Sequence, residues 1–412
     1  MIRTTCAISF AALSLSVFAA PATPAEKDLV AKLPAVYARC CEQYRGLLKQ
    51  MAAEKPDMQP KRWQDGKLVV IPPKDWCSGF FPGSLWYLYE KTGDVFWKDA
   101  ATQYTDRLLE PLRHDASNHD VGFRTYCSAG NALRLTKDPK YAAFLHDTAA
   151  ALRTRYDDNM GVIRSWDSPK GKDGFFNPQY IVIIDNMMNL ELLEWDAKNG
   201  GDPKSDAISR SQADITDLHH FRPDGSAYQV ISYNTTTRKI SGIYAGQGAC
   251  VEGTWSRGHS WAVYGYTMMF RETKNPRYLA RAMKCADYYM NEKNLPVDGV
   301  TYWDFKAPEI PNEERDASAA AITASALLEL ATLAPADKAP AYRAFGVKIL
   351  ASLASDDYLA QAGENGNFLL MHCVGNKPGW YGNHKGGEVD MPLNYADYYF
   401  LEALLRFERL VK

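Results

Sequence analysis

Three segments of the chain repeat one pattern of hydrophobic and polar positions. In each, a pattern typical of a helix ends at Thr-x-Asp/Asn-Pro/Val, an aromatic residue follows two positions later, and a new helical pattern begins. Asp and Asn at such a break accept hydrogen bonds from the free amides of a first helical turn, and Pro presets that turn. The segments are residues 88–108, 132–152 and 269–289.

The spacing of these breaks indicates a repeat of about 45 residues. Thr92 and Thr136 lie 44 residues apart, and Thr273 follows 137 residues later, near three such intervals. Another copy is expected at Asp202-Pro203. A repeat of this length suits one helical hairpin, and the chain has room for six. We therefore predict an all-α (α/α)₆ barrel, with an open helical solenoid as the alternative.

Residues 224–244 depart from the helical pattern. They are rich in β-branched and aromatic residues with polar interruptions and turn signals, which predicts a short β-hairpin over the helix ends, near the pocket. No linker rich in Gly, Ser or Pro divides the chain. We predict one domain over residues 26–412.

Residues 1–25 show the pattern of a signal peptide. Arg3 precedes an apolar run at residues 7–18, and small residues that suit cleavage follow at residues 19–25. The run is shorter than the roughly 20 residues that span a bilayer, and no later stretch approaches that length. We expect an exported protein, periplasmic or secreted, without membrane insertion.

Charge and cysteine content exclude several classes of protein. The formal net charge of −2 argues against electrostatic binding of nucleic acid. The eight cysteines have no paired CxxC spacing, and a disulfide framework is not expected in a domain of this size. Neither His219-His220 nor His372-Cys373 matches a zinc spacing, so no metal site is predicted.

An acid stands in an apolar setting within residues 181–195. The apolar positions predict a buried helix with Asp185 and Asn186 in its first turn. A buried unpaired charge costs several kcal/mol, so such a carboxyl is paired, solvated in a cavity or kept neutral by a raised pKa. Asp185 is also a possible helix-start residue, although Ile184 and two methionines are unusually apolar neighbours for a cap.

A second acid, Asp120, follows His119 just before a predicted helix and is a candidate helix cap. Together with Asp185 it also suits catalysis on sugars. One carboxyl held neutral by burial or by a like-charged neighbour donates a proton and later takes one from water. Asp120 and Asp185 are therefore the candidate catalytic pair, whereas Asp316 directly precedes an Ala-rich helix and is expected to be its cap.

Several aromatic residues and one arginine are candidates for substrate binding. The guanidinium fork of Arg257 suits a substrate carboxylate, and Trp261, four residues later, falls on the same helical face. Trp76 and Trp166 are possible stacking platforms for a sugar ring.

These segments together resemble glycoside hydrolase family 88, the unsaturated glucuronyl hydrolases. The matching blocks run in order from about residue 76 to residue 406. They are WCSGFFPGSLW, HDVGFRTYCSAGNALRLT, DNMMNLELLEW, GTWSRGHSWAVYGY, YWDFKAPEIPNEERDASAAAI and PLNYADYYFLEALLR.

The resemblance implies an (α/α)₆ barrel that releases the Δ4,5-unsaturated uronic acid from the non-reducing end of oligosaccharides left by polysaccharide lyases. It implies that Asp185 protonates C4 of the vinyl ether and assists addition of water at C5, while Asp120 tunes its partner and holds the ring. It implies no metal and no organic cofactor. The implied binding residues are Trp76, His119, Trp166, Gln247, Arg257 and Trp261.

Two positions depart from the family pattern. His259 stands where the family more often has Gln, and Gln229 stands where it commonly has His. His259 is thus expected to bring a titratable group beside the site, whereas Gln229 keeps hydrogen bonding without a charge near pH 6. Both are counted among the substrate-binding candidates, and they bear on substrate preference and pH optimum.

Three other functions fit the same features. An unsaturated rhamnogalacturonyl hydrolase shares the expected barrel and chemistry but acts on pectin fragments. An inverting glycosidase cleaves saturated substrates with two carboxyls about 6.5–9.5 Å apart. A periplasmic sugar-binding protein without catalysis binds a saccharide and leaves its double bond intact. The sequence alone determines neither the adjoining sugar nor the oligomeric state.

Overall fold

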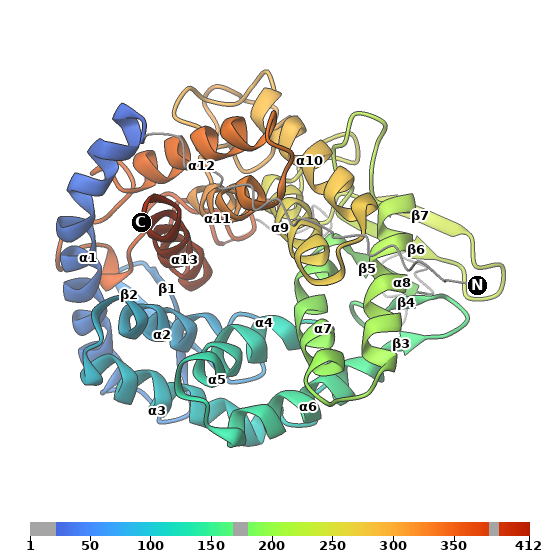
Figure 1. Ribbon diagram of the computed structural model, residues 1–412, viewed down its shortest axis with the longest axis horizontal. Coiled ribbons are helices and arrows are strands. Elements are labelled where there is room, and N and C mark those ends of the chain that lie inside the picture. Colours follow the sequence, from blue (N-terminus) through green and yellow to red (C-terminus); the bar gives the residue numbers. More distant parts are fainter. Residues whose placement is uncertain (1–21, 168–179, 379–386) are drawn as a thin grey trace, which may run out of the picture.

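The computed structural model describes residues 22–167, 180–378 and 387–412. Its helices form two concentric layers around one axis (Figure 1). The inner layer consists of α2 (Phe80–Thr92), α4 (Val121–Thr125), α5 (Asn131–Thr136), α7 (Leu190–Lys198), α9 (Ser256–Thr273), α11 (Ala317–Leu333) and α13 (Asn394–Val411), with a π-helical turn (Tyr126–Gly130) joining α4 to α5. The outer layer consists of α1 (Pro24–Met51), α3 (Val95–Leu112), α6 (Pro139–Arg153), α8 (Lys204–His219), α10 (Pro276–Asn291) and α12 (Ala339–Leu353).

The ring closes between its first and last helices. Helix α13 packs against both α11 and α2, and α1 packs against α12, so the first and last helices of the described chain close the ring (Figure 1). Closure excludes the open solenoid and confirms the predicted (α/α)₆ barrel. It also gathers the starts of the inner helices at one end of the barrel and their ends at the other.

The repeated sequence break is confirmed as a helix-to-helix connection. At the third copy the Thr273 hydroxyl donates to the carbonyl of Met269 at 2.6 Å and accepts from the amide of Asn275 at 3.2 Å. The Asn275 side chain then accepts from the amide of Arg277 at 3.1 Å and so caps α10. The other two copies show the same contacts at Thr92 with Asp94 and at Thr136 with Asp138. Asp202 likewise accepts from the amide of Lys204 at the start of α8.

The predicted hairpin over residues 224–244 is present as β6 (Val230–Tyr233) and β7 (Ile240–Tyr244). A third strand, β5 (Tyr180–Ile183), pairs antiparallel with β6 and completes the sheet. The buried helix that was predicted to have Asp185 and Asn186 in its first turn is therefore wrong at its start. Residues Ile184–Asn189 form a 3₁₀ turn, and α7 begins only at Leu190. A short Ile/Val run is ambiguous between strand and buried helix, and pairing with β6 decides it.

Two further hairpins were not predicted. They are β1 (Gln59–Gln64) with β2 (Lys67–Ile71) and β3 (Tyr156–Asp157) with β4 (Val162–Ile163). A 3₁₀ turn at Asn365–Asn367 lies beside β1 and α1. These elements lie in the connections between helices and leave the ring intact.

The space between the two helical layers is filled by large apolar side chains such as Trp86 and Trp97, both fully buried. The seven cysteines among the described residues are free thiols, and only Cys250 is exposed. No helix in the described part of the chain is both long and apolar enough to cross a bilayer. Residues 1–21, where most of the predicted signal peptide falls, lie outside the described residues.

The Asn275 cap gives a test of the repeated break. Asn275→Ala removes the acceptor for the Arg277 amide and is expected to lower the free energy of unfolding by about 1 kcal/mol, measured by equilibrium urea unfolding. Asn275→Ser keeps a capping oxygen and serves as the control, with a loss of only a few tenths of a kcal/mol expected. Equal losses in the two variants would show that the cap is not the stabilising feature.

Candidate active site

The two candidate acids lie on neighbouring segments at one end of the barrel. Asp120 directly precedes α4, and Asp185 lies in the 3₁₀ turn before α7. The segments are tied together because the Asn189 side chain accepts from the amide of Phe123 at 3.2 Å. Gly122 permits this contact, since a Cβ there would lie 2.7 Å from the Cα of Asn189.

Neither acid side chain caps a helical turn. Asp120 occupies the cap position of α4, but its side chain accepts no capping hydrogen bond. The 3₁₀ turn has no side-chain cap either, and the Oδ2 atom of Asp185 is buried without a hydrogen-bond partner among the described residues. Each residue nevertheless retains about 8% exposure. The capping explanation is thus excluded for both, and the carboxyls remain available to a ligand.

Burial and, to a smaller extent, the charge of Asp120 raise the pKa of Asp185 from 3.8 to about 7. The positive charge of Arg257 opposes this shift. The indole N–H of Trp261 also favours the charged form, although no hydrogen bond between the two side chains meets ordinary geometry. Asp185 forms no ion pair within the described ranges. A carboxyl with this pKa is in part protonated near neutral pH.

His119 is held in one tautomer beside Asp120. The Asn186 amide nitrogen donates to the carbonyl of Ile163 at 2.8 Å, which leaves its Oδ1 atom as an acceptor for His119 Nδ1 at 2.6 Å. Neutral His119 therefore carries its proton on Nδ1, and Nε2 presents a lone pair. Nε2 lies 3.3 Å from Asp120 Oδ1 and has no hydrogen-bond partner there. It is placed to accept from a ligand hydroxyl or, once protonated, to pair with Asp120.

Arg257 is almost fully buried, and its terminal nitrogens are already occupied. One donates to the carbonyl of Val374 and the other to the carbonyl of Gly375 at 2.7 Å, while Asp316 lies 3.8 Å away. Only Nε lacks a hydrogen bond. The fork predicted for a substrate carboxylate is therefore used to hold residues 374–375, and Arg257 acts on Asp185 mainly through its charge.

The predicted aromatic platforms differ in accessibility. Trp76 and Trp166 are half-buried, and Trp76 packs against Phe123 and Tyr395 with ring centroids 5.6 and 4.9 Å apart. Trp261 is fully buried and its indole N–H has no partner, so it forms part of the floor instead of an open platform.

Gln229 and Gln247 lie together on the sheet side of the site. Gln229 donates to the Gln247 side chain at 2.9 Å, and Gln247 donates to the carbonyl of Gly375 at 2.9 Å, the same residue that Arg257 holds. The carbonyl of Gln229 accepts from the amide of Ile184, directly before Asp185. The structure thus brings both glutamines to the acids through a shared network.

His259 is the one candidate that the structure places elsewhere, which corrects the prediction. Its Nε2 faces the carbonyl of Cys285 at 2.8 Å, and its ring packs on Tyr288, toward the outer helix α10. Two residues along a helix correspond to a turn of about 200°, so His259 points away from the face that carries Arg257. Burial lowers the pKa of His259 to about 4, so it adds no charge near neutral pH.

Sequence reasoning missed residues that support the site without being acids. Asn186 and Asn189 orient His119 and the start of α4, and Trp255 and Tyr395 flank the Arg257 guanidinium at 4.6 and 5.2 Å. The sequence did contain a signal for these two asparagines, because both lie among apolar residues. A buried amide side chain needs specific hydrogen-bond partners.

The remaining acids near the site are structural. Asp316 caps α11 by accepting from the amide of Ser318, as predicted. Asp304 accepts from three backbone amides of the surrounding loops. Among the described residues, no group of three His, Cys, Asp or Glu side chains is arranged to hold a metal ion. The geometry therefore offers proton transfer by Asp185, assisted by Asp120. The cluster of side chains around these acids is called the cup below and consists of Trp76, His119, Trp166, Gln229, Gln247 and Trp261.

Comparisons with known proteins cover most of the chain, although no family model matches it. The unsaturated glucuronyl hydrolase of Formosa agariphila is 45% identical over 342 residues, which span 83% of this chain and 82% of that protein. The enzyme of the same name from Bacillus sp. strain GL1 is 32% identical over 350 residues, 83% of this chain and 89% of that protein. The crystal structure of an unsaturated glucuronyl hydrolase specific for heparin superposes with a TM-score of 0.83 at 40% identity, covering 91% of this chain and 97% of the other.

The burial of Asp185 predicts a pH-dependent gain in stability when its charge is removed. The folded-state pKa is raised, so the wild-type protein loses stability as pH rises from about 4 through about 7. Asp185→Asn does not titrate, and its advantage in free energy of unfolding is expected to grow over this window by up to about 4 kcal/mol and then level off. Thermal or urea unfolding at pH 5 and pH 8 measures the difference.

Asp397→Asn is the matched control for this prediction. Burial also raises the pKa of Asp397 to about 7, but its two oxygens accept from the amides of Leu369 and Leu370 and from Tyr44. An amide cannot replace both acceptors, so this variant is expected to be less stable than wild type. Equal behaviour of the two variants would contradict an unpaired state of Asp185.

Proposed function

The chain belongs to the unsaturated glucuronyl hydrolases, a family of glycoside hydrolases, and from that premise we propose that it removes the Δ4,5-unsaturated uronic acid from the non-reducing end of lyase-generated oligosaccharides, glycosaminoglycan fragments in particular. The observation that carries the proposal is the unpaired buried carboxyl of Asp185 beside Asp120, with its pKa raised to about 7. Such a group supplies a proton at neutral pH without a metal or a charged cofactor.

The first proposed step is protonation of the C4=C5 double bond. Protonated Asp185 delivers its proton to C4, the π electrons form the new C4–H bond, and positive charge develops at C5 with help from the ring oxygen. The negative charge left on Asp185 and the charge of Asp120 stabilise this cation. Arg257 limits how far the pKa of Asp185 rises, which leaves the proton transferable.

The second proposed step is addition of water at C5. Asp185, now a carboxylate, accepts a proton from the water as its oxygen bonds to C5, which restores the acid. The product is a hemiketal whose ring opens to a ketone. Ring opening leaves C1 as a hemiacetal that bears a hydroxyl and the adjoining sugar. The glycosidic C–O bond then breaks, C1 becomes an aldehyde, and the proton lost from its hydroxyl passes to the oxygen of the released sugar.

The unpartnered groups around the acids suit the hydroxyls of an unsaturated uronate. His119 Nε2 is a free acceptor, and the indole N–H of Trp261 and the Nε–H of Arg257 are free donors. Trp76 and Trp166 supply half-buried ring faces at the edge of the same cup. A buried polar group without a partner is costly, so a ligand that satisfies several of them gains affinity and orientation.

We also propose that the protein is exported. Thr23 caps α1 in a capping box with Glu26, whose side chain accepts from the Thr23 amide at 2.7 Å. Cleavage after Ala25 would remove this cap, whereas cleavage before Thr23 preserves it. The helix start therefore favours a processing site at residues 19–22, and N-terminal sequencing of the exported protein tests it.

The assignment of roles predicts loss of chemistry without loss of binding. Asp185→Asn is expected to lower turnover of an unsaturated disaccharide by about 10³-fold or more. Turnover is measured as the loss of ultraviolet absorbance of the conjugated double bond. Disaccharide binding should persist, because the amide keeps the size of the carboxyl. Asp397→Asn, a buried acid outside the cup, should keep its turnover wherever it is folded. Near-normal turnover by Asp185→Asn would refute the proposed mechanism, and binding without turnover by the wild type would indicate a sugar-binding protein.

The pH profile separates the two acids. Because Asp185 must be protonated, kcat/KM is expected to fall as pH rises through about 7. Asp120→Asn removes a charge that raises the pKa of Asp185, so the falling limb should move to lower pH by about one unit. A limb that stays in place would show that Asp120 does not act on Asp185.

Assaying the protein on a panel of lyase products tests the proposed substrate class. Glycosaminoglycan-derived disaccharides, sulfated and unsulfated, are expected to be turned over with higher kcat/KM than the pectin-derived unsaturated disaccharide. The reverse order would assign the chain to rhamnogalacturonyl substrates. Cleavage of a saturated disaccharide would instead support the inverting glycosidase.

A further inference from the structure

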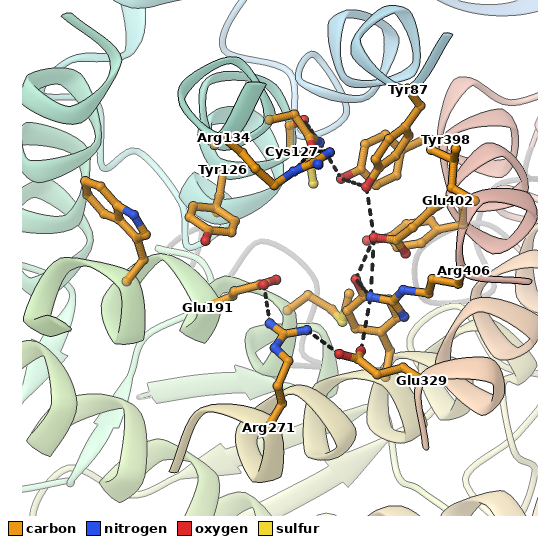
Figure 2. A pocket seen from close by; sticks show the side chains of 18 of the residues that line it. Tyr87, Tyr126, Cys127, Arg134, Glu191, Arg271, Glu329, Tyr398, Glu402 and Arg406 are labelled. Atoms are coloured by element: carbon orange, nitrogen blue, oxygen red, sulfur yellow. Dashed lines mark hydrogen bonds and ion pairs between the residues drawn. The ribbon is translucent and has the colours of Figure 1, made fainter. Parts of the chain in front are cut away.

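A cavity lies among the inner helices and reaches exposed residues at the C-terminal ends of α5, α7 and α13. It has a volume of about 870 Å³, and its lining extends from Gly122 and Met188, near the acids, to the last turns of the inner helices. Tyr87 and Tyr398 in its wall are labelled in Figure 2. A volume of this size is typical of small-molecule sites. Its lining includes neither candidate acid.

Aromatic side chains link the cavity lining to the candidate active site. Trp261 packs on Phe123 at 5.1 Å between ring centroids and on Tyr399 at 5.3 Å, and Tyr399 lines the cavity. Tyr399 therefore connects the cavity lining to Trp261, and neither candidate acid is part of that lining.

The inner wall of the cavity carries a belt of polar contacts across the inner helices. Glu402 accepts from the hydroxyls of Tyr87 at 2.9 Å and Tyr264 at 3.0 Å. Arg406 donates to Tyr264 at 2.9 Å and lies 3.1 Å from Glu329. Arg271 continues the belt by pairing with Glu329 at 2.7 Å and with Glu191, and Figure 2 shows these side chains turned toward the same space.

The belt offers donors and acceptors in alternation. Two guanidiniums, of Arg271 and Arg406, stand against three carboxylates, of Glu191, Glu329 and Glu402, so most of the charge is balanced internally. A ligand with a single strong charge at this depth would have to break one of these pairs. Hydroxyl groups, which both donate and accept, add to the belt without breaking it.

Two aromatic side chains complete the wall. Tyr126 and Trp195 are both half-buried lining residues, and Trp195 is backed by His146 at 4.8 Å between centroids. The Tyr126 hydroxyl has no hydrogen-bond partner in the described part of the protein, and Figure 2 shows it directed into the cavity. An indole face suits the apolar C–H face of a sugar ring, and the phenol supplies a free polar group at its edge.

The mouth of the cavity is positively charged. Arg134, Lys137 and Arg409 are exposed lining residues. Arg134 and Arg409 share one counter-ion, Glu90, while Lys137 forms no ion pair within the described ranges. A net positive rim attracts an acidic group that stays near the solvent.

We propose that this cavity is a second carbohydrate site, which binds a short acidic saccharide with its hydroxyls on the belt and its acidic group at the cationic mouth. The proposal goes beyond the proposed function and does not depend on catalysis by Asp185.

The experiment uses the full-length protein labelled with 5-fluorotryptophan, with glucuronate and glucose as probes. The ¹⁹F signal of Trp195, assigned by its absence in Trp195→Phe, is expected to shift saturably with glucuronate at about 1–10 mM, the range of a weak site. Glucose should bind several-fold more weakly, and added salt should reduce the difference. The signals of Trp76 and Trp166 report the active site in the same spectrum.

Tyr126→Phe is the sharpest variant, because the lost hydroxyl makes no hydrogen bond to a described residue and the fold should keep its stability. It is expected to weaken the glucuronate-dependent shift of Trp195 by about 3- to 10-fold while kcat/KM on the unsaturated disaccharide stays unchanged. A Trp195 signal that does not move by 10 mM, or that moves equally in Tyr126→Phe, would overturn the inference. Movement of Trp76 and Trp166 alone would also overturn it, because it assigns the sugar to the active site only. Absence of turnover with a shifting Trp195 would defeat the proposed function and leave this site standing.

Discussion

The burial of one carboxyl without a counter-ion is the constraint on which the active site depends. Asp185 gains no ion pair and leaves one oxygen without a partner, so its charged form is disfavoured and its pKa rises to about 7. A protein keeps such a group only where the surrounding structure is stable enough to hold it. The closed ring of helices provides that support, because the turn that carries Asp185 is anchored both by β6 and by the start of α4.

The two ends of the barrel handle charge in opposite ways. At the end with the acids, Asp185 is isolated and Arg257 is tied to backbone carbonyls, so that reactive groups stay unsatisfied. At the other end, the arginines of the inner helices pair with glutamates in a belt that joins neighbouring helices. Paired charges join the inner helices at the end away from the acids. At the end with the acids, buried polar groups lack hydrogen-bond partners, as is typical of sites where a ligand supplies them.

Local sequence accounts for much of the fold. The Thr-x-Asp/Asn breaks specify their own hydrogen bonds, each between residues no more than four apart, and the spacing of the breaks along the chain indicates the repeated hairpins. The prediction of a helical first turn around Asp185 failed because the local sequence there is ambiguous. The Ile/Val run before Asp185 suits a buried helix or a strand equally, and only its partner β6, about 50 residues later, decides between them.

The active site, like the fold, is determined in part by local sequence and in part by tertiary structure. The sequence by itself determined that an acid lies among apolar residues at 185, that a second acid precedes a helix at 120, and which residue types surround them. Tertiary structure alone decided that His259 faces an outer helix, that the Arg257 fork is already occupied, and that Asn186 sets the tautomer of His119. Those outcomes depend on which side chains meet across the ring. Residue type and spacing describe one helix at a time, whereas pKa and hydrogen-bond capacity are properties of the assembled neighbourhood.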